Sequence, residues 1–286
     1  MKLPAFAYAR PDSVDAALAL LADDSRDSRI LAGGQSLLAA MNFRLSSPDL
    51  LIDINRIDTL AGIDHTDGVI RIGALTRHAE VMASPLVAAE LPLLARAIRD
   101  VAHPAIRNRG TFGGSVALAD PAAEMPAIAL ACGATLVARS TRGERRIHAD
   151  DYFLGLYETA LRSDELLIAA EFAPHGARPW AFAEQARRRG DYASAGVAIL
   201  LDDAHPNAPA RVALFGVADR ALRSPAAERP LAGGAPDAAA IADAAEHVCD
   251  GIDVFGDAHA SAPMKRHLCR VLTRRALHAM TARAEP

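Results

Sequence analysis

Two pairs of adjacent glycines, far apart in the chain, constrain the fold more than any other sequence feature. In segment 30–38 an apolar strand runs into Gly33-Gly34, followed by Gln35-Ser36 and a helix-like run. Adjacent glycines let the backbone turn sharply and expose consecutive N–H groups to a ligand. A helix that begins directly afterwards adds its positive N-terminal end. The segment therefore predicts a turn that favours an anion such as a phosphate.

Segment 109–115 repeats this design, with Gly113-Gly114 between Thr111 and Ser115. Taken alone, either glycine pair is more often an ordinary turn. Two amide nests in one chain, however, suit a long diphosphate ligand that is held from both sides. Together, and with matched polar flanks, the two pairs favour a nucleotide site.

Composition excludes several classes of protein. The chain has 286 residues, 51% of them hydrophobic and 23% charged, which allows one large domain or two to three small ones with an ample core. A net charge of −4 gives no reason to expect a nucleic-acid partner. One Trp and four Tyr make an aromatic platform for bases improbable.

Location and metal content are also bounded by the sequence. No apolar run reaches the ~18 residues of a membrane span, and the N-terminus lacks the pattern of a signal peptide. Cys132, Cys249 and Cys269 lie far apart, and the histidines are scattered. This spacing argues against a zinc or iron–sulfur site in the chain and against a disulfide scaffold, so we expect a cytoplasmic location.

The first 175 residues read as alternating helices and strands. Residues 12–22 form an expected helix, capped by Asp12 or Ser13. A strand at 29–32, a helix at 37–41 and a strand at 50–54 follow it. The later expected elements are a hairpin at 60–64 and 69–73, helices at 76–82, 85–101 and 120–132 (with Pro121 in its first turn), and strands at 134–139, 145–148 and 165–172.

The remaining residues follow a linker at 174–176 and show strands before helices. Expected strands at 180–187, 193–202 and 210–217 precede a loop at 224–236 and helices at 237–249 and 263–282. This order predicts an α+β domain with helices on one face of a three-stranded antiparallel sheet. We therefore expect domains at 1–175, with subdomains at about 1–57 and 58–175, and at 176–286.

Several segments carry a resemblance to a known family, in order and over nearly the whole chain. They are 32–38, 109–115, 119–127, 158–161, 164–167, 189–193 and 272–277. The chain resembles the FAD-binding medium subunit of the xanthine dehydrogenase and carbon monoxide dehydrogenase family, the molybdenum hydroxylases. The resemblance implies an FAD-binding fold of the vanillyl-alcohol-oxidase type, with two α/β subdomains and a C-terminal α+β domain.

The same resemblance implies an extended FAD whose diphosphate lies between the two glycine loops. Ser115 departs from the family, whose members usually carry Asn there, and serine keeps a donor and acceptor with a shorter reach. We expect an altered contact at this position and an intact site. The implied cofactor residues are Leu31, Ala32, Gly33, Gly34, Gln35, Ser36, Leu37, Thr111, Phe112, Gly113, Gly114, Ser115, Asp120, Leu166, Leu167 and Tyr192.

Two of these residues have simpler interpretations as helix caps. Gln35 stands where some flavoproteins of this fold carry a histidine bonded to the flavin, so the resemblance implies non-covalent FAD; Gln35 can equally cap the helix after it. Asp120 can accept a hydrogen bond from a ribityl or ribose hydroxyl, or serve only as the N-cap of a helix at Pro121.

The remaining candidates also have two interpretations each. By resemblance the Tyr192 ring lies close to the isoalloxazine, whereas the simpler reading is a surface tyrosine. Leu166 and Leu167 offer backbone groups to the isoalloxazine edge by resemblance, and core side chains by pattern alone. Arg187 and Arg189 share one face of an expected strand, where they stabilise a reduced flavin, dock an acidic partner or are merely solvated.

No catalytic residue is evident. The chain has no Gly-x-Ser-x-Gly, no Gly-x-Gly-x-x-Gly and no phosphate-loop lysine. We therefore expect an electron-transfer subunit. A molybdenum-cofactor large subunit oxidises the substrate and a small subunit with 2Fe–2S clusters relays electrons to this FAD, in a dimer of heterotrimers. The alternatives are a free-standing flavin reductase of the same fold and a non-catalytic nucleotide-binding scaffold.

Overall fold

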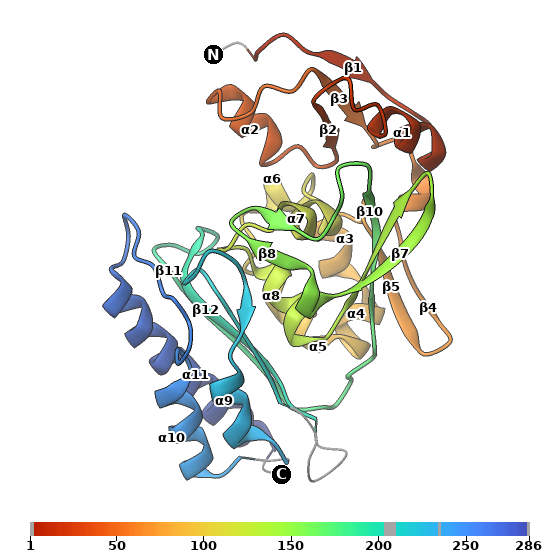
Figure 1. The fold of residues 1–286 in the computed structure, drawn as a ribbon. Coiled ribbons are helices and arrows are strands. Elements are labelled where there is room, and N and C mark those ends of the chain that lie inside the picture. Colours follow the sequence, from red (N-terminus) through yellow and green to blue (C-terminus); the bar gives the residue numbers. More distant parts are fainter. Residues whose placement is uncertain (1–2, 203–209, 234–235, 285–286) are drawn as a thin grey trace.

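The computed structural model describes residues 3–202, 210–233 and 236–284, and it has three regions, each built around a sheet (Figure 1). The N-terminal region has a parallel sheet of order β1-β3-β2, in which the central strand pairs with both neighbours. The elements are β1 (Ala7–Ala9), α1 (Val14–Leu21), β2 (Ser28–Leu31), α2 (Leu37–Asn42) and β3 (Leu50–Asp53). Of the two expected caps, Ser13 is the one used, because its hydroxyl accepts from Ala16 N at 3.2 Å.

The middle region has an antiparallel sheet of order β4-β5-β10-β6-β7. Its strands are β4 (Ile63–Thr66), β5 (Val69–Gly73), β6 (Thr135–Ser140), β7 (Gly143–His148) and β10 (Leu166–Phe172). Two short strands, β8 (Phe153–Gly155) and β9 (Glu158–Thr159), pair beside it. One face of the sheet packs on the N-terminal region through residues such as Ile168, and the other packs on helices through residues such as Ile72.

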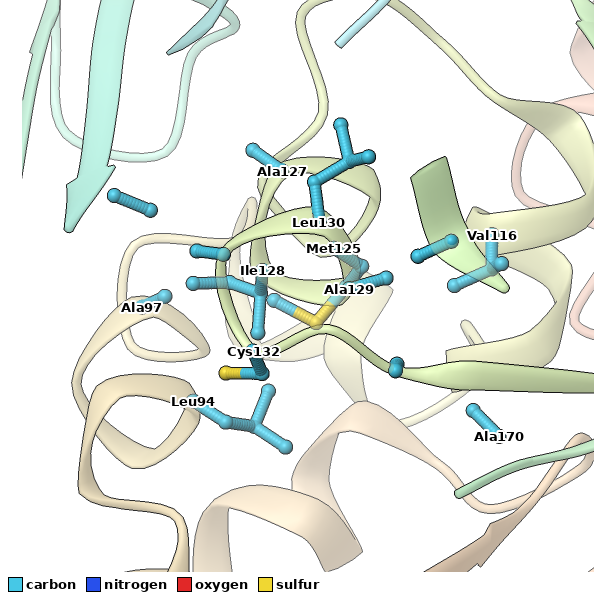
Figure 2. Close-up of a cluster of buried hydrophobic side chains, with 14 of the residues drawn as sticks. Leu94, Ala97, Val116, Met125, Ala127, Ile128, Ala129, Leu130, Cys132 and Ala170 are labelled. Carbon is cyan, nitrogen blue, oxygen red and sulfur yellow. The ribbon is translucent and has the colours of Figure 1, made fainter. Parts of the chain in front are cut away.

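The middle region also has six helices. They are α3 (His78–Ala83), α4 (Pro85–Glu90), α5 (Pro92–Ala97), α6 (Pro104–Arg107), α7 (Phe112–Leu118) and α8 (Glu124–Ala131). Of these, α5 and α8 pack against the C-terminal sheet (Figure 1). The α8 side chains belong to one buried cluster with Leu94 and Ala97 of α5, Val116 of α7 and Ala170 of β10 (Figure 2).

Two helix predictions for this region were wrong in their limits. The expected helix at 85–101 is two helices, because Pro92 takes the first position of α5 and pushes Leu91 out of the helical conformation. The helix expected from Pro121 begins instead at Glu124. Asp120 is therefore not its N-cap; its Oδ1 accepts from Ala122 N at 2.9 Å in a turn that precedes the helix.

The C-terminal region has an antiparallel sheet of order β11-β12-β13-β14. The expected strands are present as β11 (Trp180–Ala186), β12 (Ala193–Leu200) and β13 (Arg211–Phe215), and β14 (Leu222–Arg223) adds a short fourth. The helices are α9 (Pro225–Glu228), within the expected loop, α10 (Ala238–His247) and α11 (Ala262–Ala284). Residues 234–235 of that loop lie outside the described residues.

This sheet is buried on both faces, which explains why its strands read as nearly continuous apolar runs. One face packs on α8 and the other on α10 and α11. Within the described ranges, no helix is both long and apolar enough to cross a membrane. The limits 1–175 and 176–286 for the domains stay a prediction.

Candidate functional site

The first glycine loop joins β2 to α2 and presents free amides. Gly34 has a φ of +73°, a conformation that other residues rarely adopt. Among the described residues, we find no acceptor for the backbone N–H groups of Gly33, Gly34, Gln35 and Ser36. These amides are therefore available to an anionic ligand, as the sequence predicts.

Gln35 does not cap helix α2. Its Nε2 instead donates to the carbonyl oxygen of Gly33 at 2.9 Å, which closes the loop on itself. Ser36 occupies the N-cap position without a side-chain hydrogen bond. Gln35 and Ser36 are both exposed.

The second glycine loop differs from the first, because most of its amides are already bonded. Phe112 N donates to Thr76 O at 2.9 Å, and Gly113 N to Ala74 O at 3.0 Å. Gly114 N donates to the hydroxyl of Thr111 at 3.1 Å. The sequence wrongly predicted two equivalent nests. Thr111 is buried and its hydroxyl caps Gly114 N, so this loop offers the partly exposed Ser115 side chain and close backbone approach in place of a row of free amides.

The two loops touch each other through their backbones. A Cβ atom on Gly33 would lie 2.5 Å from the carbonyl oxygen of Arg109 and 2.8 Å from the Cα of Gly110. Two segments far apart in the sequence thus form one continuous wall. The free amides of the first loop lie at that junction, which suits a single ligand bound along both loops.

Asp120 lies beside two exposed tyrosines. The carboxyl group is 8% exposed, and its Oδ2 accepts from the hydroxyl of Tyr157 at 3.4 Å. Burial of the hydroxyl group, reinforced by the nearby Asp120 carboxylate, raises the pKa of Tyr192 to about 12. Both tyrosine rings remain largely exposed, Tyr157 at 56% and Tyr192 at 67%. Two aromatic faces are thus anchored at one buried acid.

Sequence reasoning did not identify Tyr157. Its backbone is left-handed, with a φ of +55°, which is uncommon for a bulky residue. A single exposed tyrosine in the β8–β9 turn carries no pattern that separates it from other surface residues. Its importance follows only from its contact with Asp120, which is distant in the sequence.

Three other candidates are buried. Leu166 and Leu167 are each 4% exposed at the start of β10, just before an irregularity in the pairing with β6. Phe112 is fully buried and packs edge-on against Phe172, with ring centroids 5.9 Å apart. Their side chains therefore belong to the core, and only backbone atoms of these residues remain as candidate contacts.

The strand-face interpretation of Arg187 and Arg189 was wrong. Strand β11 ends at Ala186, so the alternation of a strand does not extend to these residues. All three side chains of 187–189 are exposed, and Arg189 Nε lies 3.9 Å from Asp100 Oδ1. In the described part of the chain, no group of His, Cys, Asp or Glu has the arrangement of a metal site.

Comparison with known proteins gives matches over nearly the whole chain. A model of the FAD-binding domain in molybdopterin dehydrogenase matches residues 4–172, and one of the CO dehydrogenase flavoprotein C-terminal domain matches residues 180–280. The chain is 41% identical over 290 residues to the 6-hydroxypseudooxynicotine dehydrogenase complex subunit alpha of Paenarthrobacter nicotinovorans, covering 100% of this chain and 98% of the relative. It is 38% identical over 285 residues to the carbon monoxide dehydrogenase medium chain of Hydrogenophaga pseudoflava, covering 98% of each.

Solved structures match equally well. A chain of the Hydrogenophaga pseudoflava carbon monoxide dehydrogenase that lacks the Mo-pyranopterin moiety of the molybdenum cofactor superposes with a TM-score of 0.94, at 38% identity and with 99% of each chain covered. A chain of quinoline 2-oxidoreductase from Pseudomonas putida 86 gives a TM-score of 0.92 at 38% identity, with 100% of both chains covered.

Proposed function

The chain belongs to the family of FAD-binding medium subunits of molybdenum hydroxylases, and we propose that it is the subunit through which electrons leave such a complex. It is an oxidoreductase subunit whose cofactor is FAD. The bound flavin supplies the redox chemistry by taking up and passing on electrons. The protein's own residues bind the cofactor, orient it and set its electrostatic environment.

The observation that carries this function is the row of free amides at Gly33–Ser36, placed against the second loop. Amide donors at a sharp turn suit the charge and oxygen geometry of a diphosphate. We assign the diphosphate to residues 31–37 and 111–115, where the Ser115 hydroxyl adds to the amides and Thr111 shapes the second loop. Asp120, Tyr157 and Tyr192, with the backbone of 166–167, would lie along the rest of the cofactor.

The partners that we propose are the other subunits of such a complex. Among the described residues no group of side chains could hold a metal ion. We propose a molybdenum-cofactor large subunit and a small subunit with 2Fe–2S clusters, assembled as a dimer of heterotrimers in the cytoplasm. Support comes from the relatives, which are themselves a complex subunit and a medium chain.

The FAD should be released completely by acid. Gln35 folds back onto Gly33 and its carboxamide has no atom that forms a bond to the flavin. Precipitation of the purified yellow protein in trichloroacetic acid should therefore leave all flavin absorbance in the supernatant. A yellow pellet after washing would contradict non-covalent binding, and Gln35→Ala should give the same colourless pellet as the unaltered chain.

The chain alone should bind FAD yet oxidise no purine, aldehyde or carbon monoxide. Coexpression with its neighbouring genes should yield a larger species that contains molybdenum, iron and FAD, measured by metal analysis and size-exclusion chromatography. Substrate turnover by the isolated chain would refute the electron-transfer assignment and support the free-standing reductase. A purified chain that binds no flavin would instead favour the scaffold.

A further inference from the structure

Asn55 holds the residue that precedes the first glycine pair. It follows β3, and its side-chain Nδ2 donates to Ala32 O at 2.8 Å and to Leu31 O at 3.3 Å. The same amide is oriented by Asp53, whose Oδ1 lies 2.6 Å from Nδ2 and accepts from Asn55 N at 2.9 Å. The two N–H donors of this nitrogen are shared among three oxygens, and the amide turns its own oxygen away from the first loop.

Arg77 binds the side-chain oxygen of Asn55 and also contacts the second glycine loop. One guanidinium nitrogen donates to Asn55 Oδ1 at 2.6 Å, and the other donates to the carbonyl oxygen of Arg109. Arg109 directly precedes Gly110, at the place where the two loops touch. The planar guanidinium fixes both donors in one geometry, which a flexible ammonium group does not.

The charge of Arg77 is kept in a partly dehydrated place. Burial, together with the positive charge of Arg109, lowers the pKa of Arg77. The anchor behind Asn55 is equally enclosed: Asp53 is 7% exposed, and its Oδ2 accepts from the Tyr8 hydroxyl at 2.5 Å. These contacts join β1, β3 and α3 into one chain of hydrogen bonds that ends on both glycine loops.

We propose that Asn55 and Arg77 are positioning residues that fix the separation and direction of the two glycine loops and thereby set the affinity for the diphosphate of FAD. In a trans peptide the carbonyl oxygen of Ala32 and the N–H of Gly33 point in opposite directions. Holding that oxygen on Asn55 therefore aims a free Gly33 amide away from the clamp and towards the ligand side. The inference rests on the proposed function, because FAD is the ligand whose diphosphate it concerns.

The test compares FAD with riboflavin, which has no diphosphate, in Arg77→Met and Asn55→Ala. Dissociation constants come from flavin fluorescence and equilibrium dialysis with cofactor-free protein, and the unfolding midpoint is measured on the same samples. FAD should bind about 10- to 100-fold more weakly to each variant, the loss expected for charge-assisted hydrogen bonds. Riboflavin binding and the cofactor-free midpoint should change little.

Two further variants make the result specific. Arg71→Met removes a half-buried arginine whose ion pair with Glu171, at 3.0 Å, lies on the middle sheet, and it should leave FAD binding unchanged. The double variant Asn55→Ala/Arg77→Met should lose no more FAD affinity than whichever single variant binds FAD more weakly. Both residues act as one unit, so their effects should not add.

Equal losses for FAD and riboflavin, or a fall in the cofactor-free midpoint that accounts for the weaker FAD binding, would overturn the positioning role. FAD affinities that stay unchanged in both single variants would also overturn it. A failure of the unaltered chain to bind FAD would be a different result, because it refutes the proposed function itself.

Discussion

The Gly33→Ala variant should bind FAD at least about 100-fold more weakly than the unaltered chain. Its new Cβ would lie 2.5 Å from the carbonyl oxygen of Arg109 and 2.8 Å from the Cα of Gly110. Both neighbours are backbone atoms, so the loops themselves must move apart. Since the ligand is held along both loops, their separation removes the cradle; Gly33→Val should act more strongly still.

The measurement is the ratio of flavin to protein after size-exclusion chromatography, followed by the dissociation constant for FAD. The matched control is Gly143→Ala at the start of β7, where φ is +123° but no atom lies within 4 Å of the new Cβ. This substitution strains the backbone as much as Gly33→Ala does, or more. Because it lies far from the two glycine loops, the variant should keep its FAD. A folded Gly33→Ala protein with one FAD per chain would show that the diphosphate lies elsewhere.

The chain should lose stability as the pH rises from about 6.5 to 8. Below that interval the buried His78 and His175 act in the opposite direction, because burial lowers the pKa of each to about 4. Burial, followed by repulsion from Glu184, raises the pKa of Glu124 to about 8, and burial, followed by repulsion from Asp100, raises that of Glu184 to about 7. In the unfolded chain both groups ionise near pH 4.3. Across this interval the unfolded state binds fewer protons than the folded state, so the free energy of unfolding falls as the pH rises. The slope is about 1.4 kcal/mol per pH unit for each group until that group ionises in the folded state, near pH 7 for Glu184 and near pH 8 for Glu124.

The Glu124→Gln variant tests this dependence, because an amide keeps the shape and cannot ionise. Its urea-unfolding free energy should exceed that of the unaltered chain at pH 8, and its decline with pH should be shallower. Glu144→Gln, an exposed carboxylate on β7, is the control and should leave the slope unchanged. A free energy of unfolding that rises between pH 6.5 and 8 would contradict the buried acid pair.

This acid pair lies where two regions meet. Glu124 begins α8 of the middle region, and Glu184 lies on β11 of the C-terminal sheet. Asp100 and Asp120 add negative charge on the same side, whereas Arg96, paired with Asp100, opposes it. Ionisation therefore acts on the contact between the regions.

The sequence predicted well those features that depend on neighbouring residues. The first glycine loop needs Gly34 at positive φ and leaves its amides free, both of which follow from a strand, two glycines and a helix in succession. The second loop has the same local pattern and a different structure. Its amides donate to the carbonyl oxygens of Ala74 and Thr76. A local sequence pattern cannot predict an acceptor that lies so far away in the chain.

Residues that act through distant contacts escaped prediction for the same reason. Asn55, Arg77 and Tyr157 stand in ordinary polar segments, and the partners that matter here lie 23 to 37 residues away in the chain. The short strands β1 and β14 have too few residues to show an alternation. The break at Pro92 was different in kind, since proline after Leu91 was visible in the sequence.

The position of β10 also governs the order in which this protein can fold during its synthesis. Ala169 of β10 pairs with Gly73 of β5 on one side and Val137 of β6 on the other, while Ile168 contributes to the core shared with the N-terminal region. The middle sheet thus stays split, with apolar edges open, until the ribosome has released the chain past Phe172. Pairing between strands so far apart in the sequence is slow, and until it is complete, aggregation-prone apolar surface stays exposed. Cofactor loading must therefore follow translation of the first two regions, and a chain cut before β10 would leave both glycine loops without a platform.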